Sequence, residues 1–139
     1  MKVITVWEPW ASLIKEGVKR VETRSWATKY RGGLYIHAGK KILTRQNVIE
    51  YREMLELLAD TDFRYGRIVA KCRLTDCRIM DEALIGEVRK NHSEYISGFY
   101  SVGRYAWMLA DIEPLTSPIP ARGRLGLWEY NQMKNSQKE

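Results

Sequence analysis

The sequence of 139 residues is 45% hydrophobic and 29% charged, and it carries a formal net charge of +6. This composition excludes long disordered stretches, which combine low hydrophobicity with high net charge, and the length suits a single hydrophobic core. No run approaches the roughly 18 apolar residues of a membrane span and the N-terminus lacks the apolar segment of a secretory signal, so we expect a soluble, cytoplasmic protein.

The first forty residues predict two strands with a short helix between them. Residues 2–7 alternate and are rich in β-branched side chains, which is typical of a strand. Pro9 suits the first turn of a helix, and Gly17 suits its end. Residues 20–26 are expected to be extended, and residues 34–38 form a second strand after a glycine-rich turn.

The middle of the chain predicts a helix, a long strand and another helix. Thr44 is a good N-cap for a helix that we expect to end near Asp60. The apolar stripe of that helix has four members: Val48, Tyr51, Leu55 and Leu58. Residues 66–79 are rich in β-forming side chains, and Asp81 can cap the helix that follows.

The last third of the chain predicts two more strands, at residues 105–112 and 125–130. Three prolines lie between them and predict an extended connection that cannot donate fully to a ladder: Pro114, Pro118 and Pro120. Strands interrupted by short helices favour an α+β fold, a small mixed or antiparallel β-barrel with helices packed at its ends. A flat α/β sandwich is the alternative. We predict one domain over residues 1–130 and a flexible tail over residues 131–139.

The positive charge is concentrated near the N-terminus. Residues 1–45 hold ten Lys and Arg against three Glu, a balance of +7, whereas the remainder holds thirteen against fourteen acidic residues, a balance of −1. This distribution favours a polyanionic partner, although basic surface also promotes plain solubility. Cys72 and Cys77 suit neither a disulfide framework nor a zinc site. No cluster of His, Cys and carboxylate residues has the spacing of metal ligands, so we predict no metal and no cofactor.

Lys19, Glu22 and Arg24 form the most informative polar cluster. In an extended segment Glu22 and Arg24 share one face, and Lys19 approaches from the preceding turn. Arg24 can grip a phosphate or a base edge, Lys19 supplies a point charge, and Glu22 can accept from an exocyclic amine or act as a base. The alternative is an ion pair that only stabilises a strand.

Five tryptophans offer surfaces on which bases can stack. Trp10 lies on the apolar stripe of its helix, and Trp107 and Trp128 lie in predicted strands, so we expect these three in the core. Trp7 and Trp26 are the candidates for a binding cleft.

Three further polar residues are candidate ligand contacts. His37 ends a strand just before Gly39, Lys40 and Lys41, where it can face a phosphate and exchange protons near neutral pH. Lys40 adds charge at the same place. Arg122 lies in a glycine-containing turn whose backbone amides can approach an anion. The alternative for each is a structural or solvated side chain.

The sequence closely resembles the ASCH domain family. The resemblance includes Val-Trp-Glu-Pro-Trp-Ala at 6–11, Gly-x-Lys-x-x-Glu-x-Arg at 17–24, and Gly-Leu-Tyr-Ile-His-Ala at 33–38. It continues at 118–128 and implies a PUA-like β-barrel similar to RNA-binding domains. Some members resemble amidohydrolases acting on N4-acetylcytidine, and others are linked to ribonuclease activity. The amidohydrolase group has a Thr three residues after the Lys, whereas this chain has Glu22.

The main functional hypothesis is therefore binding of RNA or a modified nucleoside in a basic cleft. Its contacts are expected to come from eight residues: Trp7, Lys19, Glu22, Arg24, Trp26, His37, Lys40 and Arg122. The alternative is a small hydrolase acting on N4-acetylcytidine or RNA, with Lys19 and Glu22 as acid-base partners. A third possibility is an adaptor whose cleft recognises another protein.

Overall fold

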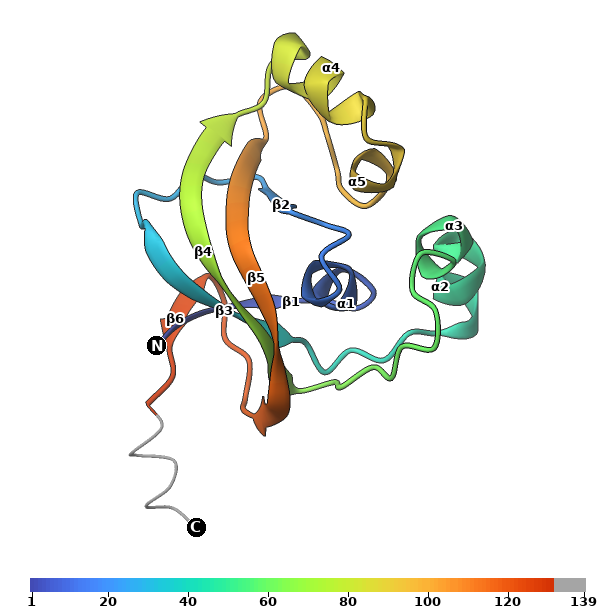
Figure 1. Ribbon diagram of the computed structural model, residues 1–139, viewed down its shortest axis with the longest axis vertical. Coiled ribbons are helices and arrows are strands. Elements are labelled where there is room, and N and C mark those ends of the chain that lie inside the picture. The colour runs from blue at the N-terminus through green and yellow to red at the C-terminus, as the bar shows by residue number, and fades with distance from the viewer. Residues whose placement is uncertain (132–139) are drawn as a thin grey trace.

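The computed structural model describes residues 1–131, in which strands and short helices alternate (Figure 1). The predicted tail, residues 131–139, lies outside the described residues except for Asn131. The elements in chain order are β1 (Lys2–Val6), α1 (Trp10–Lys15), β2 (Val21–Arg24), β3 (Gly32–Ala38), α2 (Arg45–Glu50), α3 (Arg52–Leu55), β4 (Arg67–Ile79), α4 (Glu82–Arg89), α5 (His92–Ile96), β5 (Tyr105–Pro120) and β6 (Leu127–Glu129).

One sheet contains the six strands of the described chain, in the order β2-β5-β4-β3-β1-β6. Only β1 and β3 run parallel, with Thr5 opposite His37, and the other neighbours are antiparallel. Bulges in the long β4–β5 pair bend the strands, and the sheet curls into a half-barrel (Figure 1). The predicted α+β class is confirmed, whereas the flat sandwich is not what forms.

The largest hydrophobic cluster of the described residues lies between the sheet and α1. Leu34, Ile36 and Trp107 from the sheet and Ile14 from the helix are fully buried there, and α1 contacts β3, β4 and β5. The helix has no side-chain cap at Pro9. Instead the Glu8 carboxylate accepts from the Ser12 backbone N–H (2.8 Å) and hydroxyl (2.7 Å), so the first turn is satisfied from the preceding residue.

The single helix predicted after Thr44 is wrong, because the chain forms two shorter helices that meet at Tyr51. The cap itself is confirmed, since Thr44 accepts from Asn47 N–H in a capping box. Neither α2 nor α3 contains a buried residue, and Val48 of the predicted stripe is exposed. Figure 1 shows these helices standing away from the sheet, so the apolar stripe has no sheet to pack on.

The proline segment is also different from the prediction. Pro114, Pro118 and Pro120 lie inside β5, which continues to Pro120. In the described chain β2 pairs with only the first four residues of β5, so beyond Leu109 that strand has β4 as its one neighbour. A residue without an N–H is tolerated where one side of a strand is open.

Two further differences concern short elements. No helix was predicted at α5, which Asn91 caps by accepting from Glu94 N–H. His92 begins this helix and its exposed ring lies 2.7 Å from the Glu53 carboxylate. The last strand spans Leu127–Glu129, shorter than the predicted 125–130, and in the described chain it pairs with residues 2–4 of β1.

Candidate functional site

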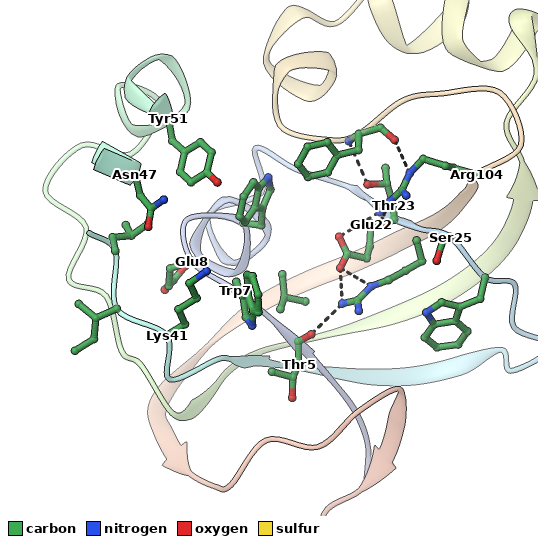
Figure 2. Close-up of a pocket in the computed structure, with 17 residues that line it drawn as sticks. Thr5, Trp7, Glu8, Glu22, Thr23, Ser25, Lys41, Asn47, Tyr51 and Arg104 are labelled. Carbon is green, nitrogen blue, oxygen red and sulfur yellow. Dashed lines mark hydrogen bonds and ion pairs between the residues drawn. The ribbon is translucent and has the colours of Figure 1, made fainter. Parts of the chain in front are cut away.

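A pocket of about 470 Å³ opens where β1 and β2 end, beside α1. Figure 2 shows Lys41, Asn47 and Tyr51 on one side of it and Ser25 and Arg104 on the other, with Glu22 between them. The residues that line it are 5–8, Trp10, 22–26, 41–43, Asn47, Tyr51, Phe99 and Arg104. Residues far apart in the sequence therefore share one concave surface.

The centre of the pocket is an ion pair between Glu22 and Arg24. Arg24 donates from Nε (3.0 Å) and Nη2 (2.8 Å) to Glu22 Oε2, and Nη2 also donates to the Thr5 carbonyl at 2.9 Å. The Glu22 side chain is 8% exposed and the Arg24 side chain is 24% exposed. The predicted shared face of these residues is confirmed. Glu22 Oε1 accepts only from Thr23 N–H, which leaves this oxygen with spare acceptor capacity among the described contacts.

Aromatic side chains make the walls. Trp7 is 54% exposed, and Lys41 Nζ lies 4.3 Å from its ring centroid, within range of a cation–π interaction. Trp10 contacts Tyr51 edge-on at 5.0 Å and Phe99 at 5.8 Å between ring centroids. Trp10 therefore lines the pocket as well as packing against the core, where the sequence had placed it.

The side of the pocket that contains Phe99 and Arg104 is stabilised by hydrogen bonds that involve Thr23. Phe99 N–H donates to the Thr23 hydroxyl at 3.2 Å. Arg104 donates from Nε to the Phe99 carbonyl (3.1 Å) and from Nη2 to the Thr23 carbonyl (3.4 Å). Within the described residues neither Arg104 nor Lys41 forms a salt bridge, so both carry uncompensated positive charge at the pocket.

Trp26 completes the pocket near β5. Its ring contacts Trp107 edge-on, with 4.8 Å between centroids, and its carbonyl accepts from Trp107 Nε1 at 3.3 Å. Trp107 is fully buried and lies opposite Glu22 in the β2–β5 register. The same strand pairing therefore positions the ion pair and the indole beside it.

Lys19 lies outside the pocket lining, and its side chain is fully buried. Its Nζ has no hydrogen-bond partner among the described residues. Burial lowers the pKa of Lys19, and the nearby Glu22 and Glu94 carboxylates oppose this shift. The backbone of Gly98 covers the amine, because a Cβ placed there would lie 3.2 Å from Nζ.

Two other carboxylates near these residues are buried. Glu94 accepts from Arg20 N–H (2.7 Å) and from the Tyr100 hydroxyl (3.4 Å), and burial raises the pKa of its carboxyl. Burial likewise raises the pKa of Glu8, which lines the pocket. Both groups are therefore more easily protonated than an exposed glutamate.

The remaining predicted site residues do not line the pocket. His37 is buried behind Thr5, where its Nε2 lies 2.7 Å from the Ala121 carbonyl and burial lowers its pKa. Lys40 and Arg122 are exposed. The structure thus brings together Trp7, Glu22, Arg24 and Trp26 of the eight predicted contacts.

Sequence reasoning missed several lining residues. Phe99 and Arg104 lie in a segment without periodicity, and Tyr51 looked like part of a buried stripe. A signal did exist for Lys41, which follows Lys40 directly, but the sequence does not tell which lysine faces the pocket. Among the described residues no group of three His, Cys, Asp or Glu could hold a metal ion, and none of the described helices is long and apolar enough to span a membrane.

Comparison with known proteins gives a consistent result. The ASCH domain model matches residues 4–119. Activating signal cointegrator 1 is 29% identical in Homo sapiens and 38% identical in Mus musculus over 128 residues, which are 92% of this chain and 22% of each relative. The chain therefore spans about a fifth of the length of these relatives. The crystal structure of ASCH from Zymomonas mobilis matches with a TM-score of 0.58 and 16% identity, covering 99% of this chain and 92% of that one.

Proposed function

The chain belongs to the ASCH domain family and has its PUA-like fold, and we propose that the pocket binds RNA or a modified nucleoside by holding one base. The observation that carries this proposal is the union of aromatic walls with the Glu22–Arg24 pair in one pocket. Its volume of about 470 Å³ lies within the roughly 300–1,000 Å³ of small-molecule sites.

Each part of the pocket supplies one kind of contact to a nucleotide. The exposed Trp7 ring offers a stacking surface, which contributes roughly 1–3 kcal/mol per base. Glu22 Oε1 accepts from a ring or exocyclic N–H, and the guanidinium of Arg24 donates to an acceptor beside it. Lys41 and Arg104 attract phosphate from opposite sides (Figure 2).

We predict that the affinity for single-stranded RNA falls roughly tenfold between about 50 and about 200 mM salt, as expected when two or three phosphates are neutralised. The reason is the N-terminal surplus of charge together with Lys41 and Arg104, which line the pocket and form no salt bridge within the described residues. Titration of a labelled single-stranded oligonucleotide at several ionic strengths measures this slope.

A matched pair of variants localises the effect. Lys41→Ala should weaken binding and reduce the salt slope by about 1. Lys90→Ala removes the same charge from the C-terminal end of α4, where the lysine pairs with Glu87, and should change neither. A flat salt response would argue against a nucleic-acid ligand, and no binding of RNA or nucleoside at low salt would favour a protein partner.

A second candidate function is hydrolysis of a modified cytidine, favoured by the Lys19 amine, which has no hydrogen-bond partner among the described residues and whose pKa is lowered by burial. A neutral amine is the form that can accept a proton or attack a carbonyl. Because Nζ is covered by Gly98 and lies outside the pocket lining, we expect N4-acetylcytidine to bind with weak turnover at most.

The absorbance of N4-acetylcytidine reports its deacetylation directly. Incubation with wild-type protein and with Lys19→Met is the test, and both should leave the nucleoside largely intact. Fast turnover by the wild type that disappears in the variant would replace the binding function with hydrolysis.

A further inference from the structure

Thr5 contacts both the Glu22–Arg24 ion pair of the pocket and a buried cluster of His37 and Trp128 behind it. Its carbonyl accepts from Arg24 Nη2 at 2.9 Å. Its hydroxyl accepts from Trp128 Nε1 at 3.1 Å and lies 3.2 Å from His37 Nδ1. The β1–β6 register ends at Ile4 opposite Leu127, so Thr5 lies one residue beyond that ladder.

With a neutral His37 ring, the hydrogen atoms in this cluster have one consistent arrangement. An indole nitrogen only donates, so the Thr5 oxygen accepts from Trp128 and its own proton is free to be donated to His37 Nδ1. His37 then carries its proton on Nε2 and donates it to the Ala121 carbonyl, 2.7 Å away. A neutral ring satisfies every contact, which agrees with the burial of His37.

The cluster is also closely covered. A Cβ on Gly123 would lie 3.1 Å from Thr5 Oγ1 and 3.0 Å from His37 Cε1. The His37 and Trp128 rings are packed edge-on with 5.6 Å between centroids. The hydroxyl of Thr5 is therefore held by two neighbours under a tight backbone, and it has little freedom to rotate.

We propose that Thr5 is a positioning residue: its hydroxyl, fixed by Trp128 and His37, orients the carbonyl that holds Arg24 and thereby the Glu22 carboxylate in the pocket. The chain of contacts runs from β6 and β3 through one residue of β1 to β2. The consequence for ligand affinity rests on the proposed function, whereas the link itself exists without a ligand.

Two substitutions separate the hydroxyl from the shape of the side chain. Thr5→Ser keeps the hydroxyl and removes the methyl group, whereas Thr5→Val keeps the branched shape and removes the hydroxyl. NMR of the free protein reads the Arg24 Nε–H exchange rate and the ring tautomer of His37. We expect the serine variant to match the wild type, and the valine variant to lose the single tautomer and exchange Arg24 Nε–H about tenfold faster.

Ligand affinity is the second measurement. With single-stranded RNA as the probe, Thr5→Val should bind about tenfold more weakly, as for one lost hydrogen bond, and Thr5→Ser less than about twofold. Trp128→Phe removes the indole N–H donor together with the five-membered ring and keeps one aromatic ring. It should shift both readouts in the same direction and is the alternative variant if Thr5→Val does not fold. Unchanged exchange and tautomer in Thr5→Val would overturn the proposal, whereas failure of the wild type to bind any nucleotide would refute only the binding function.

Discussion

Replacement of Arg24 by lysine is expected to lower the affinity for single-stranded RNA by about 10- to 100-fold while the positive charge is kept. Arg24 uses Nε and Nη2 to hold Glu22 and the Thr5 carbonyl at the same time. A lysine ammonium lacks this planar fork, and hydrogen bonds to charged groups contribute about 1.5–3 kcal/mol. Calorimetry at low salt measures the change.

Arg73→Lys is the matched control. Arg73 also donates through Nε to a carboxylate, Asp111, at 2.6 Å, but the pair is exposed on β4 and β5, outside the pocket lining. This variant should leave RNA affinity intact and change stability by no more than about 1 kcal/mol. If Arg24→Lys binds RNA as tightly as the wild type does, Arg24 does not belong to the site.

Replacement of Lys19 by methionine is expected to increase the free energy of unfolding by about 1–3 kcal/mol. The amine is fully buried without a hydrogen-bond partner among the described residues, and an unsatisfied buried polar group carries a cost of this size. Methionine is unbranched and of nearly equal length, so it fills the same space. Urea unfolding at neutral pH gives the difference.

The increase in the free energy of unfolding that Lys19→Met produces should depend on pH. Burial lowers the pKa of Lys19 in the folded protein below 10.5, the ordinary value, which the unfolded chain retains. Between these two pKa values the unfolded state binds more protons, so wild-type stability rises with pH. The advantage of Lys19→Met is therefore largest below the folded pKa and shrinks as the pH approaches 10.5.

Lys71→Met provides the comparison for Lys19. Lys71 is half-exposed and pairs with Glu113 at 3.3 Å, so its replacement should change stability by less than about 1 kcal/mol. RNA binding should survive in both variants, because neither lysine lines the pocket. If Lys19→Met is less stable than the wild type at every pH, the amine is held favourably by Glu22 and Glu94.

Local patterns in the sequence predicted helices and strands well where the pattern has one structural explanation, such as strand alternation or a helix cap. The alternation in residues 2–7 gave β1, and the caps at Thr44 and Asp81 both accept the backbone N–H groups expected of them. The period of two in an extended segment also placed Glu22 and Arg24 on one face. These features depend on near neighbours in the chain.

Features that depend on distant partners could not be predicted in this way. The stripe around Val48 has helical spacing, yet no sequence rule shows that Val48 stays exposed while Leu58 is buried and Tyr51 packs on Trp10. Lysine is almost never fully buried without a partner, so the position of Lys19 contradicts the general expectation. The pocket is assembled from four separate segments, and only the segments at residues 5–10 and 22–26 overlap a recognisable motif.

The prolines of β5 have a consequence for self-association. Within residues 1–131, β5 has no strand on one side beyond Leu109, and a strand with free N–H groups on such a side is a template for pairing with another chain. Pro114, Pro118 and Pro120 lie in this stretch and have no N–H to offer. A further strand added at this edge would find an interrupted row of donors, so the half-barrel can leave its longest strand partly uncovered without inviting edge-to-edge aggregation.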